Sequence, residues 1–147
     1  MTAFSPREQG VIKIRMNPFI RERDPGYTYD MTRPEAEKAF PWLNEHWQTF
    51  GGFFARPPGG ESLSEVSQRV YTFLNTLFRD RAGKKVWVML HGGTLRAVRF
   101  LLEHWTYDEA LYWPKGQSPE NCGITVYAFD KKKGRLVLQE YNTIAWH

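Results

Sequence analysis

The stretch from Val86 to Val98 constrains the fold of this chain more than any other part of it. It reads Val-Trp-Val-Met-Leu-His-Gly-Gly-Thr-Leu-Arg-Ala-Val. The apolar run Val86–Leu90 predicts a buried strand of a parallel sheet. Apolar residues then recur at helical spacing, which predicts a helix over Thr94–Trp105. In an open α/β sheet, ligands bind beyond the carboxyl ends of the strands, so His91 is the first candidate for a ligand contact.

The two glycines after His91 fit a binding site and also a plain turn. Gly92 and Gly93 let the backbone turn sharply and come close to a ligand. Free N–H groups at the start of the helix, around Gly93 to Leu95, favour an anion. Strand-to-helix turns commonly carry glycine, however, so a hydrogen-bonded loop histidine beside a tight connection explains the same residues. These residues alone do not distinguish the two interpretations.

Length and composition indicate one globular domain over residues 1–147. The chain is 41% hydrophobic and 16% aromatic, which is typical of a protein with a packed core. Its net charge of +4 is mild and suits electrostatic steering of a phosphorylated substrate. No nucleic-acid-binding motif accompanies the charge, so we expect no nucleic-acid partner. Cys122 is the single cysteine, and no apolar run is long enough to span a membrane. These features favour the cytoplasm and no membrane association.

The first half of the chain predicts one strand and two helices. Val11–Met16 mixes β-branched and basic residues as a short strand does. Thr32 and Glu35 form a capping box, and the helix that they begin is interrupted at Pro41 before it continues towards Trp47. Ser62 and Glu65 form a second capping box. The helix that follows has one apolar stripe and ends near Gly83; the stripe contains Leu63, Val66, Val70, Phe73, Leu74 and Leu77.

The second half predicts a β-hairpin at the end of the chain. Residues 107–120 have no periodicity and contain two X-Pro pairs, so we expect irregular structure there. Two apolar segments, Gly123–Phe129 and Leu136–Tyr141, flank a turn and predict paired strands. The order of strand, helix, helix, strand, helix and hairpin defines an α/β fold.

Four short segments, taken in order, resemble the histidine phosphatase superfamily, whose members are phosphoglycerate mutase-like. They are Ile20–Gly26, Gly60-Glu61-Ser62, His91-Gly92-Gly93 and Asn121–Thr125. The resemblance covers residues 19–129. It implies a three-layer, phosphoglycerate mutase-like α/β fold whose sheet is mostly parallel and ends in the C-terminal hairpin.

The resemblance also implies a chemistry for these residues. In this family a histidine takes the phosphoryl group covalently, as a phosphohistidine, and a carboxylic acid protonates the leaving oxygen. The resemblance assigns the acid to Glu22 and the phosphate pocket to His91, Gly92 and Gly93. Glu61 is expected to be structural. The implied partner is a small phosphorylated substrate, with no metal and no cofactor.

The sequence departs from the family pattern in its first third. An Arg-His-Gly motif, which supplies the nucleophilic histidine in the family, is absent from this chain. We therefore expect an N-terminally truncated, incomplete domain. The missing strand belongs beside Val86–Leu90, and its loss should leave unpaired backbone and an uncovered apolar face. Such a chain is less stable, or forms a homodimer that fills the gap, or is a fragment of a longer protein. We expect the last.

Three functions therefore stay open. The first is a phosphomonoester hydrolase that acts through a phosphohistidine in the intact protein, with little activity in this chain alone. The second is a non-catalytic remnant that binds a phospholigand or a partner. The third is a metal-dependent hydrolase, in which His91 and Glu22 join some of Asp24, His46 and Asp108. Metal-ligand spacing is missing, which disfavours the third. Phosphatase is favoured over mutase because the mutases' longer substrate-loop insertions are not evident.

Overall fold

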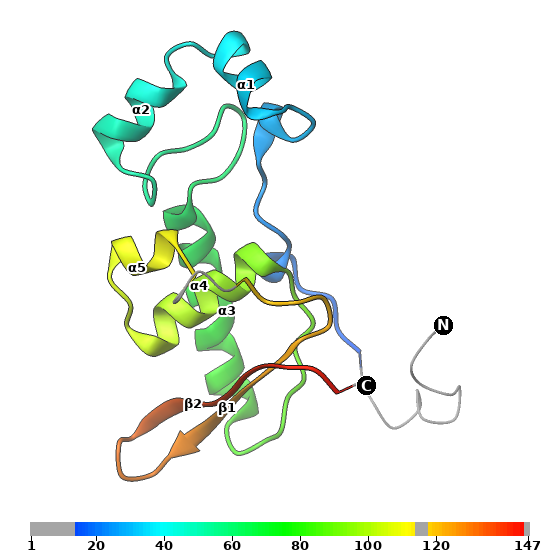
Figure 1. Ribbon diagram of the computed structural model, residues 1–147. Coiled ribbons are helices and arrows are strands. Elements are labelled where there is room, and N and C mark those ends of the chain that lie inside the picture. The colour runs from blue at the N-terminus through cyan, green and yellow to red at the C-terminus, as the bar shows by residue number, and fades with distance from the viewer. Residues whose placement is uncertain (1–13, 114–117, 146–147) are drawn as a thin grey trace.

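The computed structural model describes residues 14–113 and 118–145. The described elements are two 3-10 turns, five α-helices and one two-stranded sheet (Figure 1). Along the chain they are η1 (Pro18–Ile20), η2 (Gly26–Thr28), α1 (Arg33–Ala39), α2 (Leu43–Phe50), α3 (Leu63–Arg81), α4 (Gly92–Glu103), α5 (Tyr107–Leu111), β1 (Ile124–Asp130) and β2 (Arg135–Thr143).

Helices α3 and α4 form the centre of the structure, with α1 and α2 at one end and the hairpin at the other (Figure 1). Their facing sides make the main core, which contains Val66, Val70, Phe73, Leu74, Ala97 and Val98. The predicted apolar stripe of α3 is thus confirmed as its buried face. None of the helices in the described part of the chain has the length and apolarity needed to cross a membrane.

The start of α3 is fixed by the capping box that the sequence predicts. The Ser62 hydroxyl accepts a hydrogen bond from the Glu65 N–H at 3.2 Å, and the Glu65 carboxylate accepts one from the Ser62 N–H at 2.8 Å. These bonds satisfy two backbone donors around the helix start. The predicted break at Pro41 is also confirmed, since α1 ends at Ala39 and α2 begins at Leu43.

The segment Val86–Leu90 differs from its prediction, because it is not a strand in this structure. Val88 and Leu90 pack against the main core, whereas Trp87 is 84% and Met89 91% exposed. This alternation of buried and exposed side chains is the period of a strand. A strand also needs a hydrogen-bonded neighbour, and the only described sheet pairs β1 with β2. The predicted parallel sheet is therefore not formed by the described residues.

The hairpin is confirmed, with antiparallel pairing from Asp130 opposite Arg135 to Ile124 opposite Thr143 and register shifts near Val126. Two other segments differ from the prediction or lie partly outside the described residues. Tyr107–Leu111 was expected to be irregular, yet it is helix α5, which begins with a third capping box. The predicted strand Val11–Met16 lies outside the described residues up to position 13, and residues 14–16 have no regular structure.

A buried polar cluster attaches the hairpin to α4. The Arg99 side chain, in a residue only 5% exposed, donates to the two carboxylate oxygens of Glu103 at 2.7 and 3.0 Å. The Tyr127 hydroxyl of β1 donates to the same carboxylate at 2.6 Å. Burial would raise the pKa of Glu103, but the hydrogen bonds from Arg99 and Tyr127 hold it below its usual value. The cluster fixes the C-terminal end of α4, opposite the turn that begins at Gly92.

Candidate functional site

His91 is the N-cap residue of α4, at the position where the segment 86–90 meets the helix. Its backbone is extended, with φ −114° and ψ 169°, and its carbonyl accepts the hydrogen bond of the Leu95 N–H at 2.8 Å. The residue is exposed, and its side chain makes no capping hydrogen bond. An imidazole therefore stands in solvent beside the N–H groups of a helix start, an environment that favours anions.

The carboxylate of Glu22 lies against the same helix turn. One of its oxygens accepts a long hydrogen bond from the Gly93 N–H at 3.4 Å, and the other accepts one from the Arg23 N–H at 2.7 Å. Gly93 permits this approach, because a Cβ atom there would lie 2.6 Å from Oε1 of Glu22 and 3.1 Å from Cβ of Arg23. The Glu22 carboxylate thus lies at the helix terminus of which His91 is the N-cap residue.

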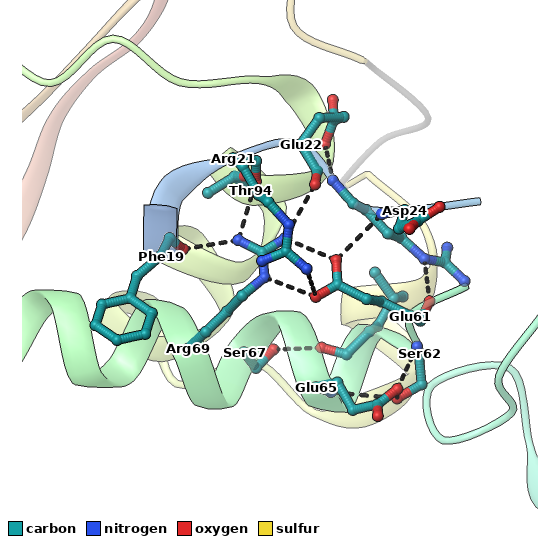
Figure 2. Close-up of polar contacts among 12 residues, drawn as sticks. Phe19, Arg21, Glu22, Asp24, Glu61, Ser62, Glu65, Ser67, Arg69 and Thr94 are labelled. Atoms are coloured by element: carbon teal, nitrogen blue, oxygen red, sulfur yellow. Dashed lines mark hydrogen bonds and ion pairs between the residues drawn. The ribbon is translucent and has the colours of Figure 1, made fainter. Parts of the chain in front are cut away.

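The loop that carries Glu22 is tied to α3 by Arg69, as Figure 2 shows. The guanidinium donates to the carbonyl of Phe19 at 2.7 Å, of Arg21 at 2.9 Å and of Glu22 at 3.2 Å. It also donates to both carboxylate oxygens of Glu61, each at 3.0 Å. One side chain of α3 thereby satisfies three carbonyls of a loop that has no sheet partner.

Glu61 completes this attachment from just ahead of α3. Its carboxylate also accepts from the Arg21 guanidinium at 2.6 Å and from the Asp24 N–H at 3.1 Å. Burial would raise the pKa of Glu61, but the hydrogen bonds from Arg69 and the Asp24 N–H, with the charges of both arginines, hold it below the usual glutamate value. Glu61 is therefore an ionised anchor of the loop.

The opposite side of the loop is held by α4. Thr94 is fully buried, and its hydroxyl donates to the carbonyl of Arg21 at 2.6 Å. The segment from Phe19 to Asp24 is thus bonded to α3 through Arg69 and to α4 through Thr94 (Figure 2). Its position relative to the first turn of α4 is set from both helices.

The guanidinium groups of Arg23 and Arg96 interact electrostatically with the Glu22 carboxylate. Arg23 donates from Nε to the carbonyl of Glu61 at 2.8 Å. Arg96, one turn into α4, donates to the carbonyl of Leu111 at 3.0 Å and lies 5.0 Å from the centre of the Trp113 ring. Burial and the charge of Arg96 lower the pKa of Arg23, and burial lowers the pKa of Arg96. Arginine stays protonated at neutral pH, so both side chains bring positive charge to this side of α4.

The other described histidines lie elsewhere. His46 is in α2 and contacts the rings of Trp42 and Phe50. His104 is the C-cap residue of α4, so it is about one helix length, roughly 18 Å, from the His91 end. Neither of them comes to His91. In the described part of the chain no three side chains of the types His, Cys, Asp and Glu gather into a metal-binding group, so the metal-dependent alternative has no ligand set there.

Sequence reasoning missed Arg69, which has the most hydrogen bonds in the site. A signal for it was present, because Arg69 follows Val66 by three residues and precedes Val70 by one. It therefore falls on the buried stripe of α3, where a charged side chain needs a partner. Its partner Glu61 is eight residues earlier, but its other partners are carbonyls of a loop more than forty residues earlier, for example Phe19, and no local pattern predicts them.

Comparison with known proteins identifies the family and the fold of this chain. The sequence pattern of the histidine phosphatase superfamily (branch 1) matches residues 2–142 of this chain. The chain therefore belongs to the histidine phosphatase superfamily. Among solved structures it is similar to YhfR of Bacillus stearothermophilus, with a TM-score of 0.75 and 19% identity over 95% of this chain and 66% of that one. A mycobacterial glucosyl-3-phosphoglycerate phosphatase, solved with inorganic phosphate, gives a TM-score of 0.70 and 19% identity over 92% of this chain and 68% of that one.

The curated relatives include a phosphatase and a phosphoglycerate mutase. The broad-range acid phosphatase DET1 of Saccharomyces cerevisiae is 30% identical over 86% of this chain and 37% of its own length. A 2,3-bisphosphoglycerate-dependent phosphoglycerate mutase of Methylobacterium radiotolerans is 36% identical over 57% of this chain and 40% of its own length. The chain thus spans less than half the length of these curated relatives.

Proposed function

We propose that the first turn of α4, with His91 and Glu22, binds the phosphoryl group of a small phosphomonoester. The observation that carries this proposal is that the N-terminus of α4 has an exposed histidine as its N-cap residue and the Glu22 carboxylate at the Gly93 N–H. Anionic phosphoryl oxygens would accept hydrogen bonds from the His91 imidazole and from the free N–H groups of the helix start. The solved relative that contains inorganic phosphate supports the ligand class.

Glu22 is the proposed proton donor to the leaving oxygen. A departing alkoxide needs a proton, and a general acid has to lie beside the phosphoryl group to give it. Glu22 meets this condition through its contact with the Gly93 N–H. Positive charge from Arg23 and Arg96 would stabilise the negative charge that spreads over the phosphoryl oxygens in the transition state.

We also propose that the full reaction proceeds through a phosphohistidine whose nucleophilic histidine is not supplied by the described residues. His46 and His104 do not reach His91, for the reasons of placement given above. The three-layer arrangement with a mostly parallel sheet belongs to the same proposal. It would give the segment 86–90 the strand neighbours that the described residues do not provide.

The test is hydrolysis of p-nitrophenyl phosphate by the purified 147-residue chain, beside His91→Ala and the control His104→Ala. We expect turnover near the uncatalysed rate for all three, because loss of a nucleophile removes several orders of magnitude of rate enhancement. Strong turnover that disappears in His91→Ala alone would show that this chain supplies its own nucleophile and would contradict the proposal.

A non-catalytic phospholigand-binding module is the second candidate, and the separation of His91 from His46 and His104 favours it. Both candidates predict phosphate binding by this chain, so turnover distinguishes them only in a form of the protein that supplies a nucleophile. Hydrolysis recovered by adding free imidazole, a small nucleophile, would favour the phosphatase. A preformed binding site that never turns over would favour the binding module.

A further inference from the structure

We propose that Arg69 is the positioning residue for Glu22: it fixes the backbone of the acid's loop so that the carboxylate lies at the Gly93 N–H. This inference rests on the proposed function, in which Glu22 is the proton donor. No contact of Arg69 with the Glu22 carboxylate or with the His91 side chain is found among the described residues. Its contacts are with loop carbonyls and with Glu61.

Among the described side chains, Arg69 bonds the most carbonyls of this loop. The backbone from Phe19 to Glu22 is in neither a strand nor an α-helix, and three of its carbonyls accept from one guanidinium. The Arg69 side chain is only 9% exposed, so water does not readily replace it. Three carbonyl contacts and the ion pair with Glu61 come from one planar group, so the loop keeps the position in which all of them form together.

The chemistry of the side chain also matters. A guanidinium is planar and carries five N–H donors that point in fixed directions. Arg69 uses them on three carbonyls and on the two carboxylate oxygens of Glu61. A lysine ammonium at the same position has three donors on one atom and cannot span these acceptors. Arg69→Lys therefore keeps the charge beside Glu61 while giving up most of the hold on the loop.

The helix behind Arg69 makes it a stable base. Its neighbours Val66 and Val70 are fully buried in the core between α3 and α4. Thr94 of α4 holds the carbonyl of Arg21 from the other side. The hydrogen bond between the Gly93 N–H and the Glu22 carboxylate is already long, at 3.4 Å. A small shift of the loop away from α4 would therefore break it. Placement of the acid is thus the property most sensitive to Arg69.

The experiment follows the Gly93 amide by ¹H–¹⁵N NMR during an acid titration of the full chain. When the Glu22 carboxylate takes up a proton, its hydrogen bond with the Gly93 N–H changes and the amide signal moves. Glu22→Gln identifies that movement, because it removes the titrating group and leaves any movement caused by His91. Unfolding by urea is measured on each sample, so that loss of fold is separated from loss of placement.

We expect the Glu22-dependent movement of Gly93 to be lost in Arg69→Ala and in Arg69→Lys, and kept in the matched control Arg79→Ala. Arg79 is on the same helix, but it is exposed and bonds only to Asp80. If Arg69→Ala does not fold, Arg69→Lys decides the question. A folded Arg69→Lys or Arg69→Ala chain that keeps the movement at its original size would overturn the inference.

The same samples separate this inference from the proposed function. Inorganic phosphate is added to the unsubstituted chain, and the signals of His91 and Gly93 are followed. A chain that fails to bind phosphate there, but loses the Gly93 movement in the Arg69 variants, contradicts the proposed function and supports the positioning role. Phosphate binding together with an unchanged Gly93 movement in the variants does the reverse.

Discussion

Gly93 is the residue of α4 whose backbone N–H faces the Glu22 carboxylate. A methyl group there would lie 2.6 Å from an oxygen of Glu22, whereas nothing lies within 4 Å of one at Gly92. The two neighbouring glycines thus offer the same substitution with and without a clash. Comparing alanine at the two positions separates the clash with Glu22 from the general effect of replacing glycine in a helix.

Gly93→Ala should move the Glu22 carboxylate away from the helix start with little change in the free energy of unfolding. The clash displaces the carboxylate, while alanine forms helix better than glycine by up to about 1 kcal/mol. The readouts are urea unfolding and the Glu22-dependent titration of the residue 93 amide. Gly92→Ala is the control and should keep the titration. An intact titration in Gly93→Ala would refute this account of the contact.

At this scale the sequence predicts the exposed residues of the site better than the buried ones. His91 and its glycines stand out because their spacing is local. Glu22 is assigned through family resemblance, and the structure places its carboxylate at Gly93. Arg69 was missed because its role depends on contacts with a loop that is distant in sequence.

At the scale of elements, α3 and the Glu22 loop depend on one ionised carboxylate. The pKa of Glu61 is lower in the folded chain than its usual value, so the folded state binds this proton less tightly than the unfolded state. By linkage, the stability from Glu61 is fully present above the usual glutamate pKa and is lost as pH falls through the lowered value.

Glu61→Gln should therefore weaken the dependence of stability on pH below about 4.5. The variant is expected to be less stable at neutral pH, by about 1–3 kcal/mol, because it removes the charge that faces Arg69. Urea unfolding at several pH values measures both effects. Glu45→Gln, on the exposed side of α2, is the matched control. A Glu61→Gln chain with the original acid dependence would contradict this assignment.

The elements themselves were predictable where the signals are local. The apolar stripe and the capping box of α3 are local signals, and so are the apolar spacing of α4 and the turn of the hairpin. Helix α5 was missed because five residues are too few for a period to be visible, although Thr106 and Glu109 form its capping box. Val86–Leu90 has the composition of a strand, but a strand exists only with its neighbour, which lies outside any local window.

At the scale of the whole molecule, the segment 86–90 leaves an apolar edge exposed. Trp87 is 84% exposed and Met89 is 91% exposed. Among the described residues, residues 85–90 have no backbone–backbone hydrogen bond. Unpaired strand-like segments with large apolar side chains are sites of association.

Changing Trp87 and Met89 together to lysine should reduce association of the chain and leave its stability within about 0.5 kcal/mol. Neither side chain contributes to the core, so only the exposed edge changes. Light scattering at increasing concentration and urea unfolding are the measurements. Val88→Ala, on the packed side of the segment, is the contrast and should cost about 1 kcal/mol. Equal association before and after the double substitution would contradict the role of this edge.

Phosphate binding at the first turn of α4 is measured by a ¹H–¹⁵N NMR titration of the chain with inorganic phosphate. We predict saturable shifts of the His91 imidazole and of the amides of Gly92, Gly93 and Thr94. His91→Ala should weaken the affinity by about tenfold or more, because it removes one charge-assisted hydrogen bond, and His104→Ala should leave it unchanged. Shifts that avoid this turn, or equal affinity in His91→Ala, would contradict the account.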